Sequence, residues 1–179
     1  MIKKKTVKDY IRTIPDFPVP GVMFRDVTTL FNDADGFQLA IDEMTAMFRG
    51  TKVDSIVGID ARGFVLGGAL AYKLHRPFTP VRKAGKLPGD TIKVAYALEY
   101  GEAELEIHKD ALAAGHHTLL VDDLLATGGT AEAAIKLIEQ LGGHVAAATF
   151  LVDLPDLGGR KRLEDMGITV QALAAFDGE

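Results

Sequence analysis

The transition that decides the fold of this chain lies in the segment Thr118-Leu119-Leu120-Val121-Asp122-Asp123-Leu124-Leu125-Ala126-Thr127-Gly128-Gly129-Thr130. Its first four residues form a short uncharged run, which is typical of a buried strand. Behind the loop, residues 131–141 place apolar side chains on one helical stripe, namely Ala134, Ile135, Ile138 and Leu141. Gly142 and Gly143 then end the predicted helix, because glycine adopts the left-handed conformation at little cost. The segment therefore predicts a strand, a short loop and a helix in succession.

The same unit occurs along the rest of the chain. An apolar, β-branched run at 53–59 precedes a small-residue helix at 63–71, and further apolar runs occupy 145–152 and 168–173. Strands that alternate with helices predict an α/β fold with a central, mostly parallel sheet and helices on both faces. Because domains average ~150 residues, we expect residues 1–179 to form a single domain.

Two segments depart from this alternation. Residues 1–35 contain Pro15, Pro18, Pro20 and Gly21, and we expect them to be mostly irregular and to form a hood over one end of the sheet. Residues 93–108 alternate in polarity and turn at Gly101, which predicts a projecting flexible hairpin. Together with the basic residues before it, the segment 83–108 is a candidate lid.

Composition and charge exclude several classes of protein. The chain has no cysteine, which rules out disulfides, a thiol nucleophile and thiolate metal sites. With 20 Lys and Arg against 25 Asp and Glu, the net charge is −5, so no surface for duplex nucleic acid is expected. No apolar run reaches the ~18 residues of a membrane span, and none follows the basic N-terminus as in a secretion signal. We expect a cytoplasmic protein without nucleic-acid or membrane partners.

The loop after the first strand has the features of a phosphate socket. Gly128 and Gly129 allow successive backbone N–H groups to converge on one point. Thr127 and Thr130 add hydroxyl donors, and the start of the following helix adds a partial positive charge. Residues 119–131 are therefore expected to bind a phosphate monoester.

Two adjacent carboxylates, Asp122 and Asp123, precede this socket. Carboxylates repel phosphate but accept hydrogen bonds well from vicinal hydroxyls, so socket and acids together indicate a ribose 5-phosphate site. A plainer interpretation is an acidic turn between a strand and a helix. Other nucleotide motifs do not fit, because Gly129 is not followed by Lys and no Gly-x-Gly-x-x-Gly follows a strand.

Residues 122–130 resemble the phosphoribosyl diphosphate motif of the type I phosphoribosyltransferases. Further segments resemble the adenine phosphoribosyltransferases within that family: Ile14–Pro18 with Phe24-Arg25-Asp26, Ala61-Arg62-Gly63-Phe64, Val81–Gly89 and Leu98-Glu99-Tyr100-Gly101. The resemblance is in register from about residue 9 to residue 165. It implies the type I phosphoribosyltransferase fold, a homodimer, and transfer of a phosphoribosyl group from 5-phosphoribosyl 1-diphosphate to adenine, giving AMP and pyrophosphate.

The resemblance also implies roles for charged residues near the phosphate loop. Arg62 stands at a strand end beside a helix N-terminus and is implied to hold the pyrophosphate and to act in catalysis. Lys83 and Lys86 are assigned to the pyrophosphate side, although the residues do not tell whether they serve their own or a neighbouring subunit. Magnesium is expected to be carried by the substrate, with no metal site in the empty protein. The sugar-phosphate contacts are expected from Asp122, Asp123, Ala126, Thr127, Gly128, Gly129 and Thr130.

For the base, the resemblance places Phe24 against the purine ring, with backbone groups of Met23 and Arg25 at its edge and Leu154 on the opposite side. Glu99 is the candidate for proton transfer, and Tyr100 is implied to enclose the reacting bond. Plainer interpretations are a core aromatic for Phe24 and an exposed hairpin pair for Glu99-Tyr100.

Three alternatives stay open from the residues alone. The base could be hypoxanthine, guanine, xanthine or orotate, although hypoxanthine–guanine relatives typically carry Asp where this chain has Ala126. The protein could be a non-catalytic sensor of phosphoribosyl diphosphate, but a chain of 179 residues with a net charge of −5 has no room for a nucleic-acid-binding module. A plain sugar-phosphate-binding domain is the third.

Overall fold

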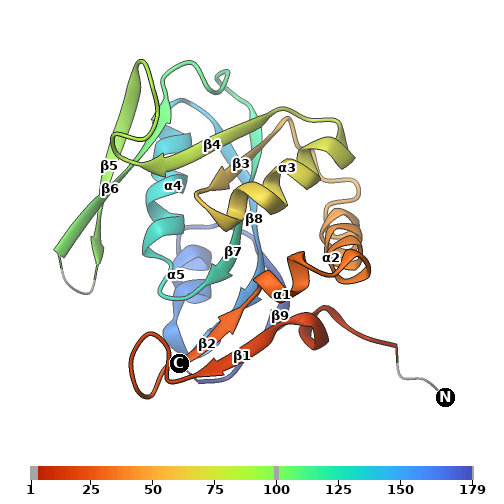
Figure 1. Ribbon diagram of the computed structural model, residues 1–179. Coiled ribbons are helices and arrows are strands. Elements are labelled where there is room, and N and C mark those ends of the chain that lie inside the picture. Colours follow the sequence, from red (N-terminus) through yellow and green to blue (C-terminus); the bar gives the residue numbers. More distant parts are fainter. Residues whose placement is uncertain (1–3, 99–100, 179) are drawn as a thin grey trace.

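The computed structural model describes residues 4–98 and 101–178 of the protein. Within these ranges seven strands form one sheet in the order β5-β6-β4-β3-β7-β8-β9 (Figure 1). Their bounds are β3 (Ser55–Ile59), β4 (Phe78–Lys83), β5 (Thr91–Leu98), β6 (Gly101–His108), β7 (His117–Leu125), β8 (His144–Asp153) and β9 (Val170–Ala175). Five neighbouring strands pair in parallel, in the order β4, β3, β7, β8 and β9. Strands β5 and β6 form an antiparallel hairpin, and β6 pairs with β4 in antiparallel orientation. The mostly parallel sheet is confirmed.

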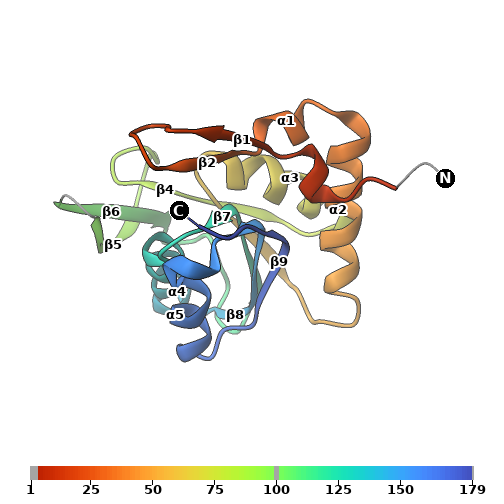
Figure 2. The same ribbon diagram turned by 90° about the horizontal axis from the view of Figure 1, so that it is seen from below.

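Helices cover both faces of this sheet, as predicted. Figure 2 shows α2 (Ala34–Met47) and α3 (Arg62–Leu74) on one side and α4 (Gly129–Gln140) and α5 (Gly159–Asp165) on the other. Successive residues of a strand point to opposite faces. Accordingly Leu119 of β7 packs in the core beneath α2 and α3, whereas Leu120 packs in the core beneath α4 and α5. None of the described helices has the length and apolarity to cross a membrane.

Local differences from the predicted elements have simple causes. Helix α2 was not predicted; the side chain of Asp33 caps it by accepting a bond from the Gly36 N–H at 2.9 Å. Helix α4 begins at Gly129, because Gly128 takes the left-handed conformation (φ 81°) at its N-cap. Strand β7 continues to Leu125, four residues beyond the predicted end at Val121, since it stays paired with β8.

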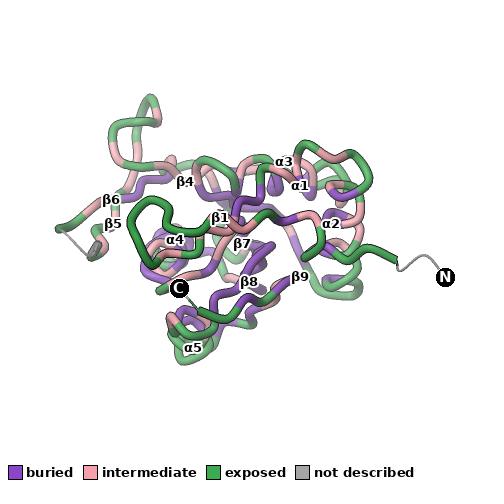
Figure 3. Tube along the Cα trace, turned by 60° about the horizontal axis from the view of Figure 1, so that its bottom comes forward, coloured by how far each residue is buried: buried purple, intermediate pink, exposed green. Residues whose placement is uncertain are grey.

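The N-terminal segment is more regular than predicted. It contains the 3-10 helix η1 (Val7–Tyr10), the strands β1 (Arg12–Pro15) and β2 (Met23–Asp26), and the short helix α1 (Thr28–Phe31). The expectation of mostly irregular structure was wrong, because the prolines and Gly21 gather at the end of β1 and in the loop 16–22, and leave the strands free to pair. Figures 1 and 2 show this hairpin across the end of the sheet at which β7 and β8 finish, and Figure 3 shows that the loop between β1 and β2 is exposed.

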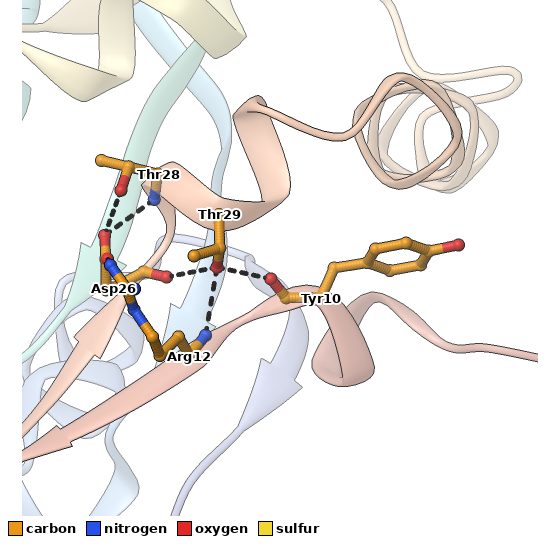
Figure 4. Close-up of polar contacts among 5 residues, drawn as sticks. All are labelled: Tyr10, Arg12, Asp26, Thr28 and Thr29. Atoms are coloured by element: carbon orange, nitrogen blue, oxygen red, sulfur yellow. Dashed lines mark hydrogen bonds and ion pairs between the residues drawn. The ribbon is translucent and has the colours of Figure 1, made fainter.

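A cluster of hydrogen-bonded polar residues at the base of the β1–β2 hairpin joins the hairpin to α1 (Figure 4). The buried carboxylate of Asp26 accepts bonds from Arg12 Nη2 at 2.6 Å, from Thr28 Oγ1 at 2.5 Å and from the Thr28 N–H at 3.0 Å. Thr29 Oγ1 donates to the carbonyl of Tyr10 at 2.7 Å and accepts from the Arg12 N–H at 3.2 Å. The Thr28 hydroxyl and the Arg12 guanidinium hold the pKa of Asp26 below its usual value.

Replacing Asp26 with alanine is expected to lower the free energy of unfolding by about 2 kcal/mol at pH 7, since hydrogen bonds to a charged acceptor are lost. Because folding lowers the pKa of Asp26, its ionic contribution is present above the unfolded pKa of ~3.9 and disappears as the pH falls through the folded value. Thermal or urea unfolding from pH 7 to pH 3 should show that the stability difference between the two proteins shrinks once the pH falls below ~3.9. A difference in unfolding free energy that stays constant over this range would contradict the ionic role. Asp26→Asn keeps one acceptor for Thr28, so its unfolding free energy should fall about half as much as that of Asp26→Ala.

Candidate active site

A cavity of about 430 Å³ opens at the carboxyl edge of the sheet, where β3 and β7 end and α3 and α4 begin. Such edges are where open α/β sheets bind their ligands. The residues that line it come from these ends, from the end of β4 and from the hairpin of β5 and β6: Ile59, Asp60, Ala61, Arg62, Lys83, Tyr96, Leu105, Asp122, Asp123, Leu124, Leu125, Ala126, Thr127, Gly128, Gly129, Thr130 and Ala131. One cavity thus brings together the predicted phosphate loop, both aspartates, Arg62 and Lys83.

The phosphate loop presents unused backbone donors to this cavity. Among the described residues, no backbone hydrogen bond of the loops and caps uses the N–H of Ala126, Thr127 or Gly128 as donor. Gly129 and Thr130 are the first residues of α4, whose N–H groups have no acceptor within the helix. These five amides therefore lie where a phosphate can accept from them.

The back of the loop rests on α5, which the sequence analysis did not anticipate. The N–H of Gly159 donates to the carbonyl of Ala126 at 3.0 Å, and a Cβ added to Gly159 would lie 2.2 Å from that oxygen. Arg162 pairs with Glu132 of α4 and approaches the carbonyl of Thr127 at 3.4 Å. The Gly158-Gly159 doublet was the sequence signal that could have revealed this close approach.

The two aspartates end up in different environments. Asp123 is buried, with 5% of its surface exposed, and Arg62 Nε donates to its Oδ2 at 2.5 Å. Asp122 accepts from the N–H of Asp123 at 2.8 Å, and burial together with the charge of Asp123 raises its pKa well above the usual value. Two adjacent carboxylates in this environment resist carrying two full charges. Gly63 lets α3 approach these acids, since a Cβ there would lie 2.7 Å from the carbonyl of Val121.

Two carboxylates hold the end of β4 and the basic loop that follows it. Arg82 Nε donates to Asp60 Oδ2 at 2.7 Å, and the Asp60–Ala61 peptide beside it is cis. Glu106 of β6, 1% exposed, accepts from the N–H groups of Lys86 and Leu87 at 2.8 Å each. Burial opposes ionisation of Glu106, but these backbone donors and that of Gly85 outweigh it and lower its pKa. Of the two predicted lysines, Lys83 lines the cavity and Lys86 lies exposed in this loop.

The chain is similar to known proteins over most of its length. A family model described as a phosphoribosyl transferase domain matches residues 31–171. The adenine phosphoribosyltransferase of Cereibacter sphaeroides is 64% identical over 174 residues, covering 97% of this chain and 98% of its own, and that of Ruegeria pomeroyi is 61% identical over 178 residues, covering 99% of each chain.

The chain belongs to the adenine phosphoribosyltransferase family. Solved structures of the family share its fold. The enzyme from Thermoanaerobacter pseudethanolicus superposes with a TM-score of 0.91 at 48% identity, covering 95% of this chain and 98% of its own. The enzyme from Saccharomyces cerevisiae, complexed with an imino-altritol bisphosphate and adenine, superposes with a TM-score of 0.88 at 40% identity, covering 94% and 96%.

The residues that the family resemblance assigned to the base lie outside the lining of this cavity. Met23 and Phe24 are on β2 of the hairpin, and Phe24 meets the ring of Phe17 edge-on at 5.1 Å between centroids. Arg25 Nη1 donates to Thr13 Oγ1 at 2.6 Å. Leu154 directly follows β8, with its N–H donating to the carbonyl of Leu125 at the end of β7. The residues assigned to the base thus come from two separate elements, β2 of the N-terminal hairpin and the segment directly after β8.

Two predicted residues of the family site, Glu99 and Tyr100, lie outside the described residues. In the hairpin of β5 and β6, the described residues that line the cavity are Tyr96 and Leu105, neither of which was predicted. Over residues 4–98 and 101–178, no cluster of three or more His, Cys, Asp or Glu side chains is arranged to hold a metal ion.

Proposed function

We propose that this protein transfers the phosphoribosyl group of 5-phosphoribosyl 1-diphosphate to adenine, giving AMP and pyrophosphate, as a reaction of purine salvage. The observation that carries the proposal is one cavity that combines unused loop amides at a helix N-terminus with two adjacent carboxylates and cationic side chains. Family membership at more than 60% identity over nearly the whole chain supports the same activity.

The sugar phosphate is seated by the loop 122–130. The amides and hydroxyls of Thr127 and Thr130 receive the 5-phosphate, and the glycines let the backbone approach it. The ribose hydroxyls donate to Asp122 and Asp123. Arg62, Lys83 and Lys86 face the pyrophosphate, whose several negative charges need local neutralisation in a protein of net charge −5.

Adenine is placed between Phe24 and Leu154, with the backbone of Met23 and Arg25 at its edge. A main-chain carbonyl accepts a hydrogen bond from a 6-amino group, whereas a 6-oxo group would meet it as acceptor against acceptor. The residue at position 126 supports adenine over hypoxanthine or guanine, because this chain has Ala126 where those relatives typically carry Asp.

The chemical step breaks the bond from the anomeric carbon to pyrophosphate, whose oxygen takes the electron pair, and forms a bond from N9 of adenine to that carbon. The proton that N9 loses passes to Glu99. The sugar passes through an oxocarbenium-like state, as at a glycosidic centre. Arg62 stabilises the charge that develops on the leaving group, while the loop and the aspartates hold the ribose in line. The hairpin of β5 and β6 is proposed to act as a lid that excludes water.

Magnesium fits the donor set, since Mg²⁺ prefers oxygen ligands and commonly binds substrate phosphates together with one or two carboxylates. Asp122 and Asp123 are the residues that would reach it, through water. When bound it supplies charge neutralisation on the diphosphate.

Glu99→Gln is expected to lower kcat about 10²-fold with little change in KM for adenine, because general acid–base catalysis contributes that much and the amide cannot accept the proton of the base. Steady-state kinetics at saturating donor measures both constants. The neighbouring exposed acid Glu102 provides the control, as Glu102→Gln. An unchanged kcat in Glu99→Gln would remove Glu99 from the chemical step.

The function is tested by incubating the protein with phosphoribosyl diphosphate, magnesium and one base at a time, and detecting the nucleotide by chromatography. AMP should form at least tenfold faster than IMP, GMP or XMP. Product only with another base would replace adenine as substrate, and binding of the donor without any product would favour a sensor. We further propose a cytoplasmic homodimer without nucleic-acid or membrane partners, which light scattering and cell fractionation test.

A further inference from the structure

The C-terminal segment that follows β9 is attached to the end of β8. The N–H of Phe176 donates to the carbonyl of Asp153 at 3.1 Å, and the N–H of Gly178 donates to Asp156 Oδ2 at 2.8 Å. Phe176 is 8% exposed and belongs to the core beneath α2 and α3. Since Asp153 immediately precedes Leu154, the backbone of Phe176 lies beside one wall of the proposed adenine site.

Two cations of the N-terminal hairpin region converge on the ring of Phe176. Lys8 Nζ lies 4.4 Å from the ring centroid and Arg25 Cζ lies 4.6 Å from it. Both cations also bind backbone carbonyls of the residues on either side of Phe176: Lys8 Nζ donates to Ala175 at 2.6 Å, and Arg25 Nη2 donates to Asp177 at 3.1 Å. Phe176 and its neighbours thus hold η1 and β2 at the same time.

These contacts connect the two walls of the proposed base site. Arg25 follows Phe24 on β2, and its side chain is fixed on one side by Thr13 and on the other by Phe176 and Asp177. Leu154 belongs to the strand end to which Phe176 is bonded. The separation of Phe24 from Leu154, into which a purine ring must fit, therefore depends on how Phe176 holds Arg25.

We propose that Phe176 is a positioning residue for adenine, which holds the hairpin strand β2 at the distance from Leu154 that the base requires. The inference rests on the proposed function, because it takes adenine as the ligand. A cation over an aromatic face is attracted by the ring quadrupole, so an aliphatic side chain of similar size at 176 keeps the packing but loses this attraction. The phosphate socket is built from other elements and does not depend on the contact.

The test compares Phe176→Leu with Phe176→Tyr, which keeps an aromatic face. Phe176→Leu is expected to raise KM for adenine about tenfold while KM for phosphoribosyl diphosphate changes less than about twofold, and Phe176→Tyr should stay within about twofold of wild type. The matched control is Phe48→Leu, since Phe48 is 7% exposed in the same core and contacts neither cation. An unchanged KM for adenine in Phe176→Leu, or an equal rise in Phe48→Leu, overturns the proposal.

Two further measurements keep the test decisive. Lys8→Met alters an exposed side chain, and it should raise KM for adenine about two- to fivefold because the attraction between the cation and the ring is lost. No rise in KM counts against the proposal. Hydrogen exchange of the β1 and β2 amides needs no activity, and Phe176→Leu should accelerate it about tenfold relative to Phe48→Leu. If the wild-type protein forms no AMP, the proposed function fails. If, in addition, the hydrogen-exchange rates of Phe176→Leu and Phe48→Leu are equal, the positioning role of Phe176 is overturned as well.

Discussion

Gly159→Ala is expected to reduce kcat/KM for phosphoribosyl diphosphate by at least about 100-fold, because a misplacement of about 1 Å in a binding group costs that much. The added Cβ would lie 2.2 Å from the carbonyl oxygen of Ala126 and 2.9 Å from the nitrogen of Gly128. Both are backbone atoms of the phosphate loop, so the clash is relieved only by moving the loop away from α5. The amides that receive the phosphate would move with it.

Steady-state kinetics and thermal unfolding together check this prediction. Gly68→Ala in α3 is the matched control, since no atom lies within 4 Å of its added Cβ; it should keep full activity and gain up to about 1 kcal/mol from helix propensity. Gly128→Val should behave like Gly159→Ala, because Gly128 has φ 81° and its Cβ would lie 3.1 Å from Gly159 Cα. Activity of Gly159→Ala within about threefold of wild type would show that the loop does not need the support of α5.

Asp123→Asn is expected to lower turnover about 100-fold while the melting temperature changes by only a few degrees. The substitution keeps the shape of a buried side chain but weakens the acceptor that holds Arg62 Nε at 2.5 Å. Arg62 and the ribose hydroxyls both lose their charged partner, so the leaving group and the sugar are positioned less well. Removing the charge of Asp123 also lowers the pKa of Asp122, which that charge helps to raise.

Kinetics with adenine and the donor, and calorimetric titration with ribose 5-phosphate, separate the two effects. Weaker binding of ribose 5-phosphate together with slower turnover supports the role of Asp123 at the sugar. The exposed acid Asp110, which does not line the cavity, provides the control as Asp110→Asn and should behave like wild type. Near-normal turnover in Asp123→Asn would remove the carboxylate from the proposed site.

Elements with a strong local pattern were predicted well. The strand at 118–121, the helix behind it and the hairpin around Gly101 are each specified by residues within a few positions of one another, through apolar spacing or turn chemistry. The hairpin of β1 and β2 was missed because its prolines dominate the local signal, whereas pairing across the loop decides the conformation. Helix α2 has a capping Asp33 but went unpredicted, since its cap is a weaker signal than a glycine-rich loop.

The sequence by itself determined the α/β alternation, the loop of amides and hydroxyls at 127–130, and the acids that precede it. These features depend on neighbouring residues, whose order along the chain already sets their spacing. Only the tertiary structure decided that Arg62 pairs with Asp123, that Gly159 supports Ala126, and that Phe176 holds Arg25. Each of these contacts joins residues more than thirty positions apart in the sequence. Which of these distant residues meet in space follows from how the strands are ordered in the sheet.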